Sequence, residues 1–174
     1  GYAAMLYFSN PQLSAISPYW VCKKILSFFK LKNVQLFDLG VAEKTSKVVF
    51  EIPLQETGVP SAGQAHMASR NNFISGGSEY YSFTKKKLVE CKVVSLDDPN
   101  WDGALENISF VKIDIEGAEL FALKGMRQLL VKQNPVILLE VCSFFLKGFG
   151  IAENTLREFA EEINYSFYSY NPIN

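Results

Sequence analysis

Acidic side chains surround a glycine in the stretch VKIDIEGAELFALKG, residues 111–125. Asp114 and Glu116 follow an apolar run typical of a buried strand, and Gly117 suits a tight turn into a helix. A carboxylate at the end of a buried strand needs a partner or a ligand, because an unpaired charge is costly to remove from water. Such groups act as general bases or hold hydroxyl groups. Asp114 and Glu116 are therefore candidate catalytic residues, whereas Glu119 is more typical of a helix-start acid.

A further carboxylate, Glu140, follows a second apolar run, NPVILLEV at 134–141. In open α/β sheets, ligands bind at the edge where the carboxyl ends of the parallel strands meet. We therefore expect Glu140 to lie beside the first group of acids as a third candidate catalytic residue. Asp97 and Asp98 end another apolar run, and we expect them on the same edge, although Asp-Asp-Pro is also a common way to open a turn.

These acids have to be positioned by a sheet and its helices. The apolar runs and the helical period between them indicate a βαβ unit. We expect 108–114 and 135–141 to be adjacent parallel strands, joined through a right-handed crossover by one helix at 118–132.

The same patterns predict the other elements. We expect an amphipathic helix at 19–31, a strand at 33–43 paired with or close to a strand at 47–53, a strand at 89–98, a helix at 155–163 with Asn154 as its N-cap, and a last strand at 165–170. This alternation of helices and strands predicts an α/β fold.

Residues 55–79 are rich in Gly, Ser and Asn, which predicts a long, largely exposed loop that is mobile or folded over the strand ends. His66, the only histidine, lies in this loop. It is a secondary candidate for a base if the loop closes over the site, but a lone histidine in a loop is more often simply solvated.

The composition restricts the class of protein. The 174 residues predict a single domain, 1–174, and a formal net charge of −1 gives no reason to expect a nucleic-acid partner. No apolar run is long enough to span a membrane. The three cysteines lack metal-binding spacing, so we expect free, buried thiols and a cytoplasmic location. Clustered oxygen ligands are compatible with Mg²⁺, but nothing in the spacing predicts a metal site. The sequence leaves the oligomeric state open.

Residues 33–170 resemble the FkbM family of S-adenosylmethionine-dependent methyltransferases. The resemblance is strongest in FVKIDIEGAELFALKGMRQLLVKQNPVILLEV, at 110–141, which follows the family's strand, KIDxEGxE turn, LKG helix and P-x-I-L-L-E strand. It implies an α/β, Rossmann-like class I methyltransferase sheet that is mostly parallel. It also implies that the acids at 114–119 edge the mouth of the active site.

The resemblance is incomplete at the N-terminus. The family's glycine-rich turn, D-x-G-x-x-x-G, has no counterpart, and residues 1–10 resemble the helix that follows that turn, with Gly1 as its last glycine. Ser17 lies near the place of the acid that holds the ribose. The resemblance then implies cofactor contacts from Gly1, Ser17, Ala42 and Asp114. We expect the sheet to be N-terminally incomplete and the chain to bind S-adenosylmethionine weakly, as a fragment of an enzyme or as a degenerate relative.

The leading hypothesis is methylation of a hydroxyl on a small-molecule or sugar acceptor. Asp114 or Glu140 would be the base, and Glu116 would orient the acceptor or the cofactor. The second hypothesis is a non-catalytic binding or scaffold domain that keeps the sheet without the cofactor. A different nucleotide-binding enzyme ranks low, because the chain has no G-x-G-x-x-G or P-loop pattern.

Overall fold

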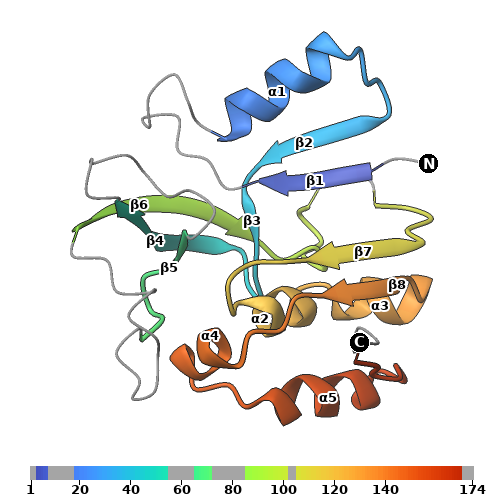
Figure 1. The fold of residues 1–174 in the computed structure, drawn as a ribbon. Helices are drawn as coiled ribbons and strands as arrows, with labels where there is room; N and C mark the ends of the chain where they lie inside the picture. Colours follow the sequence, from blue (N-terminus) through green and yellow to red (C-terminus); the bar gives the residue numbers. More distant parts are fainter. Residues whose placement is uncertain (1–2, 8–17, 55–64, 72–84, 102–104, 170–174) are drawn as a thin grey trace, which may run out of the picture.

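The computed structural model describes residues 3–7, 18–54, 65–71, 85–101 and 105–169. It shows an α/β fold in which short ladders of strands are combined with five helices in the described part of the chain (Figure 1). The elements are β1 Ala3–Tyr7, α1 Pro18–Phe28, β2 Val34–Asp38, β3 Gly40–Val41, β4 Ser46–Leu54, β5 His66–Met67, β6 Lys85–Val94, β7 Phe110–Ile113, α2 Glu119–Lys124, α3 Arg127–Gln133, β8 Val136–Leu139, α4 Ser143–Gly148 and α5 Glu153–Glu162.

The βαβ unit predicted from the sequence is present. Strands β7 and β8 pair in parallel, in a register that puts Phe110 opposite Val136 and Ile113 opposite Leu139. The segment between them is not one helix, however, because α2 ends at Lys124 and α3 begins at Arg127. The prediction of parallel neighbours is thus confirmed, and the prediction of one continuous helix at 118–132 is wrong.

Two contacts with other parts of the chain lie at the break between α2 and α3. The backbone of Gly125 lies so close to β3 that a Cβ there would stand 1.9 Å from the carbonyl oxygen of Ala42. The carboxylate of Asp97 then accepts hydrogen bonds from the backbone N–H groups of Gln128 (2.7 Å) and Leu129 (3.0 Å), near the start of α3. A second helix can begin there because these N–H groups have no partner within the helix.

The central ladder is mixed, in the order β3-β6-β4-β5. Its longest pairing, β4 with β6, is antiparallel from Ser46–Val93 to Leu54–Lys85. The expectation of a mostly parallel sheet is therefore not confirmed. The strand expected at 33–43 is divided into β2 and β3, and neither pairs with β4. Strand β6 lies between β3 and β4 and pairs with both, so the two strands are close together, as expected, but are not paired with each other.

Two terminal predictions are wrong. Residues 3–7, expected in a helix, form β1 and pair in parallel with β2. A short apolar run fits either element, so periodicity alone could not decide between them. Residues 165–169 are not a strand. Instead, Tyr165 donates its backbone N–H to Ala160 at the end of α5, and the guanidinium of Arg157 lies 5.0 Å from the ring of Phe167.

Helices α1 and α5 also differ from expectation in detail. The apolar side chains of α1 are not buried, since Trp20 is 44% and Phe28 79% exposed. Helix α5 begins after Ala152, and Asn154 lies inside it and donates to Glu158, so Asn154 is not the N-cap.

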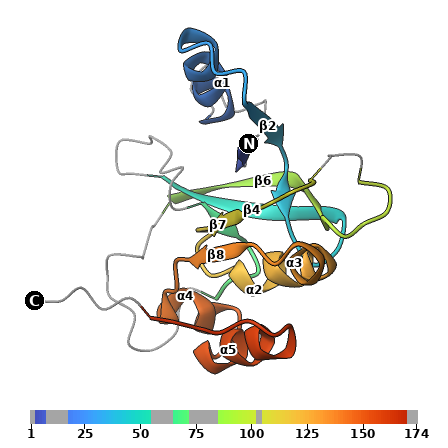
Figure 2. The same ribbon diagram turned by 90° about the vertical axis from the view of Figure 1, so that its right-hand side faces the viewer.

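The main core lies on one face of the β7–β8 pair, where α2, α3, α4 and α5 form a layer (Figure 2). Its fully buried side chains include Leu130, Leu146 and Leu156, one from each of α3, α4 and α5. The opposite face of the pair is exposed at Phe110, Val136 and Leu138. Among the described residues, no helix is long and apolar enough to cross a membrane. The three cysteines are free and half-buried.

Candidate functional site

Asp114 and Glu140 lie side by side at the carboxyl ends of β7 and β8. The register of the two strands carries them there, because Ile113 is opposite Leu139 and the Glu140 N–H donates to the Ile113 carbonyl (3.0 Å). Their carboxyl groups interact, because they share a hydrogen bond when one of them carries a proton, and this shifts the pKa of each. Lys112 donates from Nζ to Asp114 Oδ2 at 2.7 Å. Both carboxyl groups are open to solvent, so the pair is reachable by a ligand.

The two carboxyl groups have pKa values displaced in opposite directions. The hydrogen bond from Glu140, and then that from Lys112, lowers the pKa of Asp114. The hydrogen bond to Asp114 and its negative charge raise the pKa of Glu140. The two groups titrate as a pair, so the proton that binds first is held between them, mainly on Glu140.

The turn after β7 is unusual in its backbone and in what supports it. Glu116 and Gly117 both have positive φ angles, 58° and 98°. A Cβ on Gly117 would lie 2.7 Å from backbone and Cβ atoms of Phe145, so only glycine fits without a shift. The chain therefore reverses here against the start of α4.

Glu119 supports this turn from the inside. It is the first residue of α2, as expected, but it is only 2% exposed. Its Oε1 accepts hydrogen bonds from the backbone N–H groups of Ile115 (3.2 Å) and Gly117 (3.1 Å). Oε2 is buried and has no hydrogen-bond partner among the described residues. Interpreting Glu119 as chiefly a helix-start charge was incomplete, because this carboxylate also braces the backbone of the candidate site.

Glu116 is half-buried at the same turn. Burial raises the pKa of its carboxyl group, and the positive charge of Arg70 opposes that rise. Arg70 donates from Nη1 to the carbonyl oxygen of Glu116 at 2.8 Å, and the same nitrogen lies 3.9 Å from Glu116 Oε2. This contact was not foreseen, because Arg70 belongs to no recognisable motif and lies inside the segment expected to be a loop.

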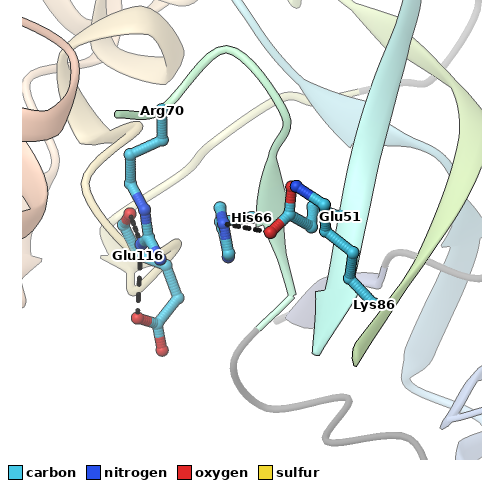
Figure 3. Close-up of polar contacts among 5 residues, drawn as sticks. All are labelled: Glu51, His66, Arg70, Lys86 and Glu116. Atoms are coloured by element: carbon cyan, nitrogen blue, oxygen red, sulfur yellow. Dashed lines mark hydrogen bonds and ion pairs between the residues drawn. The ribbon is translucent and has the colours of Figure 1, made fainter. Parts of the chain in front are cut away.

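His66 and Arg70 are buried and belong to a group of polar side chains beside the turn (Figure 3). His66 is 3% exposed and its Nε2 lies 3.9 Å from Glu51 Oε1, while Lys86 Nζ lies 2.7 Å from Glu51 Oε2. For the described part of 55–79, residues 65–71, the expectation of exposure is therefore wrong at His66 and Arg70. His66 is in β5, paired with Glu51 of β4, and is not solvated. The other residues of that expected loop lie outside the described ranges.

Asp97 and Asp98 do not join this group. The Asp97 carboxylate binds the N-terminal turn of α3, and its backbone N–H donates to Gly125. Gly125 follows the C-terminal end of α2, whereas Glu119 is at the N-terminal end of that helix. Asp98 accepts hydrogen bonds from the side chain of Thr45 (2.5 Å) and the backbone N–H of Asn100 (2.9 Å). The expected shared edge is thus reduced to the acids that follow β7 and β8.

Of the four residues expected to contact the cofactor, the structure describes Ala42 and Asp114. Gly1 and Ser17 lie outside the described residues. Ala42 is buried, donates its N–H to Val94 (2.9 Å) and packs on Gly125, away from Asp114. Asp114 is engaged by Lys112 and Glu140. The cofactor contacts expected from Gly1 and Ser17 stay predictions. Among the described residues there is also no cluster of three potential metal ligands.

Comparison with known proteins assigns the family. A family model described as the methyltransferase FkbM domain matches residues 15–167. Among solved structures, the chain is similar to the methyltransferase FkbM from Methylobacillus flagellatus KT, with a TM-score of 0.47 and 15% sequence identity over 93% of this chain. The match covers 29% of that protein. The comparison with curated proteins found no match. The match over 15–167 shows that the chain belongs to the FkbM methyltransferase family.

Proposed function

We propose that this protein is an S-adenosylmethionine-dependent methyltransferase that methylates a hydroxyl group of a small-molecule or sugar acceptor. Family membership supports methyl transfer in general. The observation that favours a hydroxyl acceptor is the Asp114–Glu140 pair, because an alcohol must lose its proton as the methyl group arrives and a carboxylate within hydrogen-bond reach can accept it.

The two pKa shifts indicate which carboxyl group of the pair accepts the proton. Glu140 is the stronger base because its pKa is raised, and we assign it the acceptance of the proton. Asp114 keeps its charge beside Lys112 and holds that proton through its hydrogen bond with Glu140. Glu116, at the half-buried turn, would orient the acceptor.

The methyl group would come from the sulfonium of S-adenosylmethionine. Because Gly1 and Ser17, two of the expected cofactor contacts, lie outside the described residues, we assign the described acids only the acceptor side of the reaction. We further propose that β1, β2, β7 and β8 belong to one Rossmann-like class I methyltransferase sheet. Both pairs are parallel, and β1 and β7 each have one edge without a partner strand in the described part of the chain. Free cysteines fit a reducing compartment, so we propose a cytoplasmic location.

The test is transfer of an isotopically labelled methyl group from S-adenosylmethionine to a panel of sugars and small alcohols. Parent protein should form a labelled ether, and Glu140→Gln should lose roughly 100- to 10,000-fold in kcat. Glu161→Gln, a change of the same type at an exposed position of α5, is the matched control and should keep full turnover.

A second candidate function is a non-catalytic binding domain. The burial of Ala42, one of the residues expected to contact the cofactor, favours it. It predicts no labelled ether from any acceptor, together with no binding of S-adenosylmethionine by calorimetry. Cofactor binding with equal turnover of parent and Glu140→Gln would instead contradict the assignment of the base.

A further inference from the structure

Arg70 contacts the candidate site without facing the solvent. It is 7% exposed, and its guanidinium donates to the Glu116 carbonyl at 2.8 Å and approaches the Glu116 carboxylate at 3.9 Å. One side chain thus binds both the backbone and the side chain of a residue that has a positive φ angle. A guanidinium is suited to this because it presents several donors in a fixed plane.

The surroundings of Arg70 leave the side chain little freedom. Its guanidinium carbon lies 4.4 Å from the ring centre of Phe145, the residue that packs on Gly117. A Cβ on Gly148 would lie 2.5 Å from Arg70 Cγ, so α4 approaches the aliphatic part of the arginine closely. The next residue, Asn71, donates its N–H to the Gly148 carbonyl at 2.8 Å. Backbone and side chain together fix the direction in which the guanidinium points.

Other charged groups connect this contact to the antiparallel strands. The negative charge of Glu51, on β4, acts on Arg70, and Glu51 is itself bound by Lys86 of β6. Figure 3 shows His66 between Glu51 and the Arg70–Glu116 contact. Arg70 therefore links the turn after β7 electrostatically to the Glu51–Lys86 pair of β4 and β6.

We propose that Arg70 is a positioning residue for methyl transfer, acting through Glu116 to fix the turn that carries the acids of the site. The proposal rests on the proposed function for its kinetic consequence. Four charged groups act on Glu116: Arg70 beyond β5, Asp114 at the end of β7, Glu119 in α2 and Glu140 at the end of β8. Arg70 is the cation among these four and the one that contacts both parts of Glu116.

The experiment compares Arg70→Met and Arg70→Lys with the parent protein, with Arg127→Met as the matched control. Arg127 is also paired with a glutamate, Glu162 at 2.8 Å, but that pair is exposed and remote from the turn. The first measurement is the titration of the Glu116 side chain by carbon NMR, assigned with Glu116→Gln. The second is the separation of kcat from KM for labelled methyl transfer, and a thermal melt verifies that each variant folds.

The expected result has two parts. Without the nearby cation, the pKa of Glu116 rises above its parent value in Arg70→Met, because Arg70 opposes the rise caused by burial. Lysine restores much of that pKa, since it keeps the charge. Turnover falls about 100-fold in both variants, mainly in kcat, because lysine lacks the planar fork that binds the carbonyl and stacks on Phe145. Arg127→Met leaves both quantities unchanged.

Different outcomes overturn different claims. An unchanged Glu116 titration in a folded Arg70→Met protein would refute the contact with Arg70, whether or not the parent is an enzyme. An altered titration with parent-like kcat would refute the positioning role. If the parent transfers no methyl group, the proposed function fails, while the titration still decides whether Arg70 sets the environment of Glu116. If Arg70→Met does not fold, Arg70→Lys alone must show the loss of kcat at a nearly parental Glu116 pKa.

Discussion

Asp114 and Glu140 face each other across two parallel strands, and their hydrogen bond moves their pKa values in opposite directions. This contact follows directly from the register of β7 with β8. A shift of the register by one residue would turn the two side chains to opposite faces of the sheet. The position of the pair therefore depends on the pairing of β7 with β8.

The first prediction concerns the pH dependence of Glu140. Asp114→Asn removes the carboxylate whose hydrogen bond and negative charge raise the pKa of Glu140, so that pKa should fall towards the ordinary glutamate value. The acid limb of kcat against pH should then move to lower pH, and turnover at neutral pH should fall because a weaker base remains. Carbon NMR titration of Glu140 and the pH profile measure both effects. An acid limb that stays in place would show that Glu140 does not control the rate.

The second prediction concerns the stability of the turn. Glu119→Ala removes the acceptor for the Ile115 and Gly117 N–H groups inside the protein. The free energy of unfolding should fall by about 2 to 4 kcal/mol, from the lost charge-assisted hydrogen bonds and the unpaired N–H groups. Denaturant unfolding measures it. Glu161→Ala, at an exposed position, is the control and should change stability by less than about 0.5 kcal/mol. Equal stability of the two variants would show that Glu119 does not brace the turn.

The third prediction separates close contact from backbone conformation at two glycines. Gly125 has an ordinary helical φ of −73°, but a Cβ there would strike the Ala42 carbonyl. Gly125→Ala should therefore cost about 3 kcal/mol or more, because backbone must move. Gly150 has a φ of +71° and open space around its Cα, so Gly150→Ala should cost only about 1 kcal/mol. Thermal melts of both variants give the order, and the reverse order would contradict the packing of α2 on β3.

The fourth prediction concerns Asp97. Asp97→Ala removes the acceptor for the Gln128 and Leu129 N–H groups, and it should lower the free energy of unfolding by about 0.5 to 2 kcal/mol. Methyl transfer at a temperature where the variant is folded should stay at the parent level, because Asp97 lies away from the Asp114–Glu140 pair. A loss of kcat without a loss of stability would show that Asp97 takes part in the candidate site after all.

The predictable part of this structure is its most local part. The run from Phe110 to Glu140 contains both strands, the turn and the helical period, so the sequence was sufficient to place Asp114 beside Glu140. The break at Gly125 was not predictable, because the residues that contact the chain there, Ala42 and Asp97, come from other parts of the sequence. A helical period records which side chains are buried, but not where another strand touches the backbone.

The role of Arg70 was hidden for a related reason. Its neighbours in sequence are small and polar, which is typical of a loop, and local composition carries no record of a partner on α4 or after β7. The burial of Glu119 was equally hidden, since an acid at a helix start is ordinarily exposed. Both assignments required the tertiary contacts.

The hydrogen bond between Arg70 and Glu116 also has a consequence for folding kinetics, because it joins residues 46 positions apart. Such a contact forms only after the long loop between the two residues has closed. Its loss removes a restraint on both segments, the one that carries Arg70 and the one that carries Glu116. The antiparallel strands and the βαβ unit should then exchange their amide hydrogens as one cooperative unit, with similar opening free energies. In Arg70→Met that unit should divide, and the amides of β4 should exchange faster than those of β7 and β8.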